Sequence, residues 1–290
     1  MASGNEEKQS VVIAVGDELL RGHTQDSNTN WLAQRLYALG FPLRRANIVA
    51  DIQDEIVLAV RAEIERQPDC LFVCGGLGPT PDDRTLSALA VALDRRLKLD
   101  PAAAEHIQVR LDWLHSVGRI KSPDMNEANR RMAEVPVGAT ILDNAIGMAP
   151  GLAFPLGRAE ASEGRHLFVL PGVPRELKTI FEDEIAPRYL AGQTGHVTEE
   201  VHFSRAVEAE FWELLNRIGA EFPGVSVGSY PQPDRGHLII RLAGAKASDV
   251  RAAAEAVRYA APAESASAGA AYLRLRQRLL RHWPWRPPGG

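Results

Sequence analysis

The sequence predicts a three-layer α/β domain with a parallel sheet, followed by a small α+β unit. Short apolar runs alternate with amphipathic stretches of helical length, and glycine-marked turns follow several of the apolar runs. Strands that alternate with helices in this way form right-handed βαβ units and a parallel sheet. The pattern changes after AGQTGH at residues 191–196, where two successive strands are expected without a helix between them.

The first domain begins with three βα repeats. The β-branched run SVVIAV and the segment CLFVC are typical of buried strands. Amphipathic spacing predicts the intervening helices, and Gly40 marks the end of the first of them. The expected order is strand Ser10–Val15, helix Thr29–Leu39, strand Pro42–Val49, helix Asp54–Arg66, strand Cys70–Cys74 and a helix that starts near Arg84.

The rest of the chain completes two domains and a tail. The first domain is expected to span residues 10–192, the small unit residues 193–260, and a disordered, basic tail residues 261–290. Further elements of the first domain are expected at Pro101–His115, Asp124–Ala133, Gly164–Leu170 and Pro174–Leu190. Those of the small unit are expected at Val197–Phe203, Val207–Ile218, Val225–Tyr230, His237–Leu242 and Ala247–Tyr259.

Composition narrows the class of protein. The chain has 290 residues, 45% of them hydrophobic and 24% charged, with a net charge of −4, so bulk electrostatic binding to nucleic acid is not expected. The N-terminus lacks the apolar core of a signal peptide, and no apolar run reaches the ~20 residues that span a bilayer. A cytoplasmic protein without a membrane partner is expected. Cys70 and Cys74 are expected to pack in the core.

The stretch GGLGPTPDDRT, residues 75–85, is the strongest candidate for a site. Gly75, Gly76 and Gly78 allow a sharp turn and bring backbone amides close to a ligand, as phosphate cradles require. The helix that follows adds an N-terminal dipole that favours an anion. Ligands of parallel sheets bind beyond the carboxyl ends of the strands, where this turn lies. The segments VGDELLRG and LPGVPREL follow other predicted strands in the same way.

Adjacent carboxylates suggest a cation at this edge. Asp82 or Asp83 alone could cap the next helix, since Asp is a preferred N-cap. Two of them, with Asp17 and Glu18 at another strand end, favour a divalent ion that bridges protein and phosphate oxygens. Oxygen ligands suit Mg²⁺, Mn²⁺ or Co²⁺ better than zinc. Helix capping and turn formation remain the alternative.

The polar run GHTQDSNTN has two interpretations. Asp26 and Asn28 could contact a sugar or base, or Ser27, Asn28 or Thr29 could simply cap the helix that follows. His23 lies near the expected site, but a single loop histidine is more often solvated. No arrangement of nucleophile, histidine and acid stands out in the sequence.

These motifs together resemble a known family over roughly residues 10–245. GDELLRGHTQDSNTNWL, GGLGPTPDDRT, NRRMAEVPVGATILDNAIGMAPG and LPGVPREL occur in the order found in the CinA-type molybdopterin-binding-like domain, which is also similar to the N-terminal part of eukaryotic FAD synthases. The resemblance implies a molybdopterin-binding-like three-layer fold with a mostly parallel sheet. The segment with GVSVGSYP resembles the small KH-like subdomain that follows in that family.

The resemblance also implies an activity. It suggests a metal-dependent pyrophosphatase that splits ADP-ribose into AMP and ribose 5-phosphate, or acts on relatives such as FAD, often with K⁺ and as a homodimer. Asp17, Asp82 and Asp83 would be catalytic, with Asp82 and Asp83 at the metal. The expected substrate-binding residues are Gly16, Glu18, Asp26, Asn28, Gly75, Gly76, Gly78, Thr80, Thr85, Asn144, Gly147, Pro171 and Gly172.

The chain departs from the family pattern in two respects. Met132 replaces the usual glutamine of NRRQA and Met148 the usual threonine of GTAPG, so two hydrogen-bonding side chains become thioethers. Full-length CinA proteins also carry a C-terminal amidase domain, and only a short tail follows residue 261 here. No amidase activity is therefore expected.

Two other classes of function remain as alternatives. A module that binds a pterin or nucleotide without turnover would need only the glycine turns. A nucleic-acid-binding protein would use the KH-like unit, but the GXXG loop of a KH clamp is not evident between Glu199 and Leu242. The acidic cluster favours the enzyme.

Overall fold

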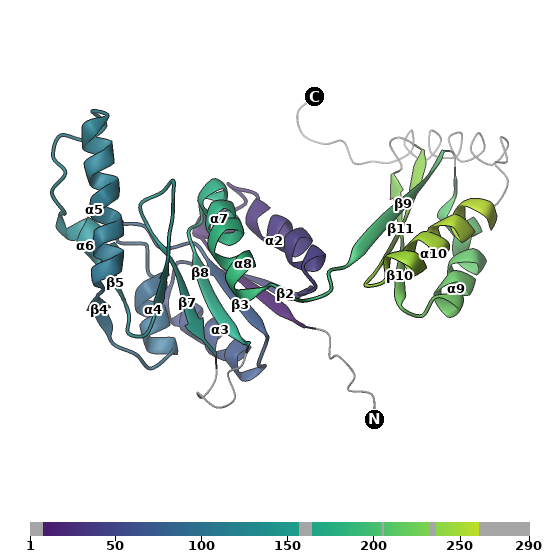
Figure 1. Ribbon diagram of the computed structural model, residues 1–290, viewed down its shortest axis with the longest axis horizontal. Helices are drawn as coiled ribbons and strands as arrows, with labels where there is room; N and C mark the ends of the chain where they lie inside the picture. Colours follow the sequence, from purple (N-terminus) through teal and green to yellow (C-terminus); the bar gives the residue numbers. More distant parts are fainter. Residues whose placement is uncertain (1–7, 157–163, 205, 233–235, 261–290) are drawn as a thin grey trace, which may run out of the picture. The chain divides into compact units, whose positions relative to one another are not determined.

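The described chain forms two compact units. The computed structural model describes residues 8–156, 164–204, 206–232 and 236–260, so the expected disordered tail at 261–290 lies outside the described residues. The first unit ends at Thr194 and the second begins at Gly195 (Figure 1).

The first unit is built around a six-stranded, mainly parallel sheet. Its strand order is β2-β1-β3-β8-β7-β6. The first four strands in this order run parallel to one another, and β7 and β6 add two antiparallel pairings at one edge. The expected α/β fold class is confirmed. The strands are β1 (Ser10–Val15), β2 (Leu43–Val49), β3 (Cys70–Cys74), β6 (Thr140–Leu142), β7 (Gly151–Pro155) and β8 (His166–Leu170).

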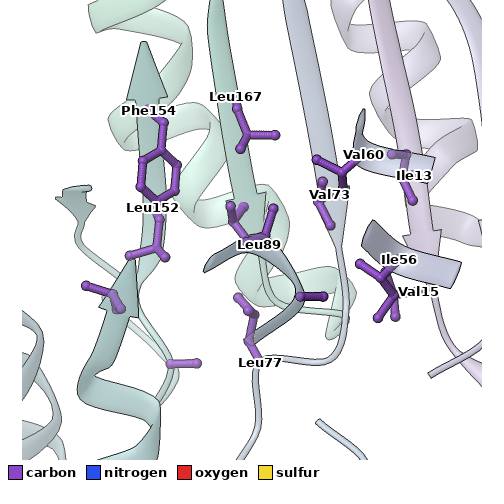
Figure 2. Packing of buried hydrophobic residues seen from close by; sticks show 14 of the residues in the cluster. Ile13, Val15, Ile56, Val60, Val73, Leu77, Leu89, Leu152, Phe154 and Leu167 are labelled. Atoms are coloured by element: carbon purple, nitrogen blue, oxygen red, sulfur yellow. The ribbon is translucent and has the colours of Figure 1, made fainter. Parts of the chain in front are cut away.

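Helices cover both faces of this sheet and make it the middle of three layers (Figure 1). Two buried clusters explain the arrangement, because alternate residues of β1, β3 and β8 enter opposite clusters. One cluster includes α3 and α4, and Figure 2 shows part of it. The other includes α2 and α7. These helices are α2 (Ser27–Ala38), α3 (Gln53–Glu65), α4 (Thr85–Ala92) and α7 (Pro174–Ile180).

Both cysteines lie within β3 as core residues. Cys70 and Cys74 belong to the cluster that contains Phe72 and Phe168, whose rings stack with centroids 5.1 Å apart. Burial raises the pKa of both thiols far above its usual range, so neither forms a thiolate nucleophile. The expected packing role of the two cysteines is confirmed.

Several element boundaries differ from expectation. The second helix begins at Ser27, because the cap is Asp26, whose Oδ1 accepts a hydrogen bond from the Thr29 amide at 2.9 Å. The expectation that Ser27, Asn28 or Thr29 caps it is therefore wrong. The long helix expected at 174–190 contains a π-helical turn at Phe181–Ile185 before α8 (Ala186–Tyr189).

The connection between α4 and β7 carries additional elements. The helix expected at 124–133 begins only after Asn126, whose side chain accepts from the Asn129 amide. Figure 1 shows α5 and α6 side by side, away from α2. The elements of this connection are β4 (Leu97–Leu99), α5 (Pro101–Ser116), α6 (Glu127–Ala133) and β5 (Glu134–Pro136). Elsewhere in the first unit, a one-turn helix α1 (Asp17–Leu20) follows β1.

The second unit is a three-stranded antiparallel sheet with two helices. Its strand order is β10-β11-β9, and a separate apolar core lies between the sheet and the helices. Such a strand-rich unit was expected, although the helix expected at 207–218 starts as a 3₁₀ turn at Glu208–Phe211. The elements are β9 (Val197–Ser204), α9 (Trp212–Glu221), β10 (Val225–Gln232), β11 (His237–Gly244) and α10 (Ala247–Ala260).

Among the residues that the structure describes, no helix is both long enough and apolar enough to cross a bilayer.

Candidate functional site

A pocket of about 620 Å³ lies in the first unit, beyond the carboxyl ends of the central strands. Residues that follow β1, β3 and β8 line it, as expected for ligand sites of parallel sheets. Residues of α5, α6 and the turn before β7 complete the wall. The lining residues are Glu18, Gly76, Leu77, Gly78, Pro79, Asp83, Arg110, Trp113, Leu114, Met132, Ile146, Gly147, Met148, Ala149, Pro171, Gly172, Val173 and Glu176.

Gly75 brings three strand ends together. Its φ is 109°, and a Cβ atom at this position would lie 2.2 Å from the carbonyl oxygen of Val15 at the end of β1. Its amide donates to the Leu170 carbonyl at the end of β8, at 3.0 Å. A Cβ atom on Gly172, after β8, would lie 3.4 Å from the Gly75 Cα atom. The backbones at this edge thus approach more closely than a side chain on Gly75 would allow.

Thr85 fixes the next part of the glycine turn. Its hydroxyl donates to the Gly75 carbonyl at 2.8 Å, and its amide donates to the Gly76 carbonyl at 3.2 Å. Thr85 is fully buried, so its contacts position the turn and do not reach a ligand. A Cβ atom on Gly76, where φ is 64°, would lie 2.4 Å from the Thr85 hydroxyl oxygen.

The turn leaves three consecutive amides without an acceptor. In the described part of the chain, the N–H groups of Gly76, Leu77 and Gly78 donate to no backbone or side-chain group. All three residues line the pocket, and α4 begins a few residues later. Unpaired amides near a helix N-terminus attract anions, especially phosphate.

Asp83 folds back over the glycine turn. Its Oδ2 accepts hydrogen bonds from the Thr80 amide at 2.9 Å and from the Thr80 hydroxyl at 2.5 Å. A Cβ atom on Gly78 would lie 2.6 Å from the same oxygen. Asp83 lines the pocket, whereas Asp82 is fully exposed and does not. The helix α4 has no side-chain cap, so the capping role considered for either aspartate is wrong.

A second pair of carboxylates lies at the ends of β1 and β2. The Asp17 amide donates to Asp51 Oδ2 at 2.8 Å, and the Asp51 amide donates to Asp17 Oδ1 at 3.4 Å. Partial burial raises the pKa of Asp51, and the charges of Glu18, Asp17 and Asp82 raise it further. Arg21 pairs with Asp17 at 2.5 Å. Asp17, Glu18, Asp51 and Asp82 outnumber this one cation, so negative charge accumulates beside the pocket.

The buried side chain of Asn144 organises the turn before β7. Its Nδ2 donates to the Ala149 carbonyl at 2.8 Å and to Glu176 Oε2 at 2.7 Å, and its Oδ1 accepts from the Gly147 amide at 2.9 Å. Arg110 donates to the carbonyls of Gly147 and Asn144 at 3.0 and 3.1 Å. Asn144 thus positions the pocket wall and does not line it.

Asn28 joins α2 to the turn after β8. Its Nδ2 donates to the Gly172 carbonyl at 2.7 Å, while its Oδ1 is buried without a partner among the described residues. Asp26 is occupied as the cap of α2. Neither residue lines the pocket, nor does the exposed His23.

The structure thus sorts the expected site residues into two groups. Seven line the pocket: Glu18, Gly76, Gly78, Asp83, Gly147, Pro171 and Gly172. The others lie behind or beside it: Gly16, Asp17, Asp26, Asn28, Gly75, Thr80, Asp82, Thr85 and Asn144. Sequence reasoning did not assign Asp51, Arg110, Trp113 or Glu176 to the site. Asp51 stands two residues after the end of a predicted strand, and that position was the available signal.

The side chains alone do not form a complete metal site. Within the described ranges, no group of three or more His, Cys, Asp or Glu side chains is arranged to hold a metal ion. A cation here would need oxygen atoms from a ligand as well as from the protein.

Comparison with known proteins identifies the family. Residues 11–191 match the model of the probable molybdopterin binding domain, and residues 196–269 match that of the FAD synthase middle domain. The chain belongs to the CinA-type molybdopterin-binding-like family. The first match coincides with the first structural unit, and the second begins one residue after the second unit does.

Two relatives and one solved structure show the extent of the similarity. Protein PH0439 of Pyrococcus horikoshii is 45% identical over 177 residues, which are 61% of this chain and 67% of that protein. A CinA-like protein of Chlorobium phaeobacteroides is 38% identical over 181 residues, 62% of this chain but 40% of that longer protein. The structure of CinA from Thermoplasma acidophilum has 32% identity and a TM-score of 0.52, covering 60% of this chain and 94% of that one.

The close contact at Gly75 yields a first prediction. We expect Gly75→Ala to lower the free energy of unfolding by at least about 2 kcal/mol, because alanine is strained at this φ and collides with the Val15 carbonyl. The thermal midpoint, measured by calorimetry, should fall by about 4–8 °C. The neighbouring Gly172→Ala is the matched control, since its added methyl makes only an ordinary contact. Equal midpoints for the two variants would contradict this interpretation.

The raised pKa of Asp51 yields a second prediction. A carboxyl whose pKa is raised on folding disfavours the folded state once pH exceeds that pKa. We therefore expect Asp51→Asn to raise the thermal midpoint at neutral pH without added metal, with the gain disappearing as pH falls through the Asp51 pKa. The exposed Asp112→Asn is the control. A pH-independent difference, or a lower midpoint at neutral pH, would show that the charge of Asp51 is not the cause.

Proposed function

We propose that the chain hydrolyses the pyrophosphate bond of a dinucleotide, with a divalent cation as cofactor. The proposed substrates are ADP-ribose, whose hydrolysis would give AMP and ribose 5-phosphate, and FAD-like molecules. The single observation that carries the proposal is the row of unpaired amides at Gly76, Leu77 and Gly78 in a pocket that also receives carboxylates. Amides of this kind bind phosphate oxygens, and the adjacent acids suit a bridging cation.

The negative charge of the pocket lining supports the proposed role of a divalent cation. Three carboxylates, those of Glu18, Asp83 and Glu176, line the wall, while Arg110 is the only lysine or arginine among the lining residues. Two further acids, Asp17 and Asp51, lie close by and raise the local negative charge. A pyrophosphate would be repelled by this lining unless a cation compensated it. The residues present therefore fit a hard divalent ion in both charge and ligand type.

Different residues would hold the cation and orient the phosphates. Asp83 would hold the ion from the pocket wall and Asp82 from its exposed position beside the pocket, with Asp17 and Asp51 contributing charge from the neighbouring strand ends. The ion, when bound, would neutralise phosphate charge and lower the pKa of a water molecule. The amides of Gly76 and Gly78 would orient the phosphates. Thr80 would hold the Asp83 carboxylate in place through its amide and hydroxyl.

A binding module without turnover is the second candidate. It is favoured by the lack of three clustered metal-binding side chains in the described part of the chain. Such a module would hold a nucleotide or molybdopterin on the glycine turns alone. The two functions differ in product release, so one assay separates them.

The direct test incubates the purified chain with ADP-ribose, FAD, NAD or CoA and follows product release. Each substrate is paired with Mg²⁺, Mn²⁺, Co²⁺ or EDTA, with and without K⁺. The proposal expects AMP and a second phosphate product from at least one substrate, only when a divalent ion is present. Binding without product under every metal condition would favour the binding module.

A third prediction separates the roles of Asp83. Asp83→Asn keeps an oxygen that can accept from Thr80 but removes one charge from the pocket. We expect turnover to fall at least ~100-fold, because the cation is held less well, while ligand affinity changes by less than about tenfold. Steady-state kinetics and calorimetric titration measure the two effects. The exposed Asp183→Asn serves as the control, and full turnover in Asp83→Asn would remove Asp83 from the metal site.

A further inference from the structure

The pocket has one wall whose chemistry the proposed phosphate contacts do not explain. Apart from the glycine turn and the acids, the pocket is lined by a group of large apolar side chains from α5, α6 and the turn before β7. These are Trp113, Leu114, Met132, Ile146 and Met148. Trp113 is 54% exposed and Ile146 is 41% exposed. Large apolar residues that gather in a pocket and stay exposed indicate a binding surface.

The fold does not require a tryptophan at position 113. The buried residues of α5 are Ala103, Ile107 and Leu111, which repeat every four positions and form the core-facing side. Trp113 lies off that side and makes no ring contact among the described residues. Its large flat face is thus available to a ligand, and a smaller side chain would satisfy the packing of α5 equally well.

Arg110 fixes the opposing turn against this helix. It lies one helical turn before Trp113, so the two side chains share a side of α5. Its guanidinium holds the carbonyls of Asn144 and Gly147, and the turn that contains them carries Ile146 and Met148 into the pocket. Met132, which is 3% exposed, also contributes to the lining from α6. The apolar wall is therefore held in place by a defined network.

We propose that Trp113, Met132 and Met148 form the subsite for the purine ring of the nucleotide substrate. This inference rests on the proposed function, in which the strand-end turns take the phosphates. Indole faces stack on nucleobases, and polarisable thioethers pack well against aromatic rings. Met132 and Met148 both line the pocket, and their apolar, polarisable side chains suit the flat face of a ring.

The test measures equilibrium binding rather than turnover. AMP and ribose 5-phosphate share a sugar phosphate but differ in the ring, so we compare them by calorimetric titration in Mg²⁺. Trp113→Ala should weaken AMP binding by about 10- to 100-fold and leave ribose 5-phosphate unchanged. Trp113→Phe should retain most of the affinity for AMP, and Met148→Gln should lose several-fold. Trp212→Ala, an exposed tryptophan of the second unit, is the matched control.

The outcomes distinguish this inference from the proposed function. Unchanged AMP affinity in Trp113→Ala overturns the ring subsite, even if ADP-ribose is hydrolysed. Loss of AMP affinity in this variant supports the subsite, even if no substrate of the panel is hydrolysed. Equal affinity of wild type for AMP and ribose 5-phosphate also overturns it. FMN is the third ligand: binding tighter than that of AMP, and equally dependent on Trp113, would overturn the purine as the occupant.

Discussion

The contact of backbone with backbone at Gly75 is the constraint on which the candidate site depends. The ends of β1, β3 and β8 meet there, because the Gly75 amide donates to the Leu170 carbonyl and a Cβ atom on Gly75 would lie 2.2 Å from the Val15 carbonyl oxygen. Because these strands converge without side chains between them, the turn that leaves β3 can pass close to the turn after β8. The amides of Gly76 to Gly78, which have no acceptor among the described residues, therefore line one pocket with Pro171 and Gly172.

Electrostatics give this pocket its second property. Parallel strands end at one edge, so acids placed after β1, β2 and β3 accumulate there. Partial burial and then the charges of neighbouring acids raise the pKa of Asp51, and Arg110 donates to two backbone carbonyls. The acidic lining repels an anionic ligand, whereas the unpaired amides attract one. A divalent cation between carboxylate and phosphate would remove the repulsion, and this is the physical basis of the proposed activity.

Much of the fold was predictable from the sequence because its signals are local. Buried β-branched runs fixed the strands, and helical spacing fixed most helices. The glycine turn after Cys74 was recognisable because close approach needs glycine. By contrast, Trp113 and Arg110 come from a helix far from the motifs, and only tertiary packing brings them to the pocket. Glu176 belongs to the segment LPGVPREL, but nothing in the sequence distinguished its carboxylate from that of an exposed helix residue. The Asp26 cap was missed because three other polar residues offered the same signal nearby.

In the proposed activity a cation joins the acidic pocket to the phosphates of its ligand. Calorimetric titration with a methylene-bridged analogue of ADP-ribose, which cannot be hydrolysed at that bridge, tests it without interference from turnover. The measurement is made on the wild-type chain in Mg²⁺ and again in EDTA at the same ionic strength. We expect the analogue to bind at least about tenfold more tightly with Mg²⁺, a difference of ~1.4 kcal/mol. Equal affinity in the two conditions would show that no cation bridges the pocket and the phosphates.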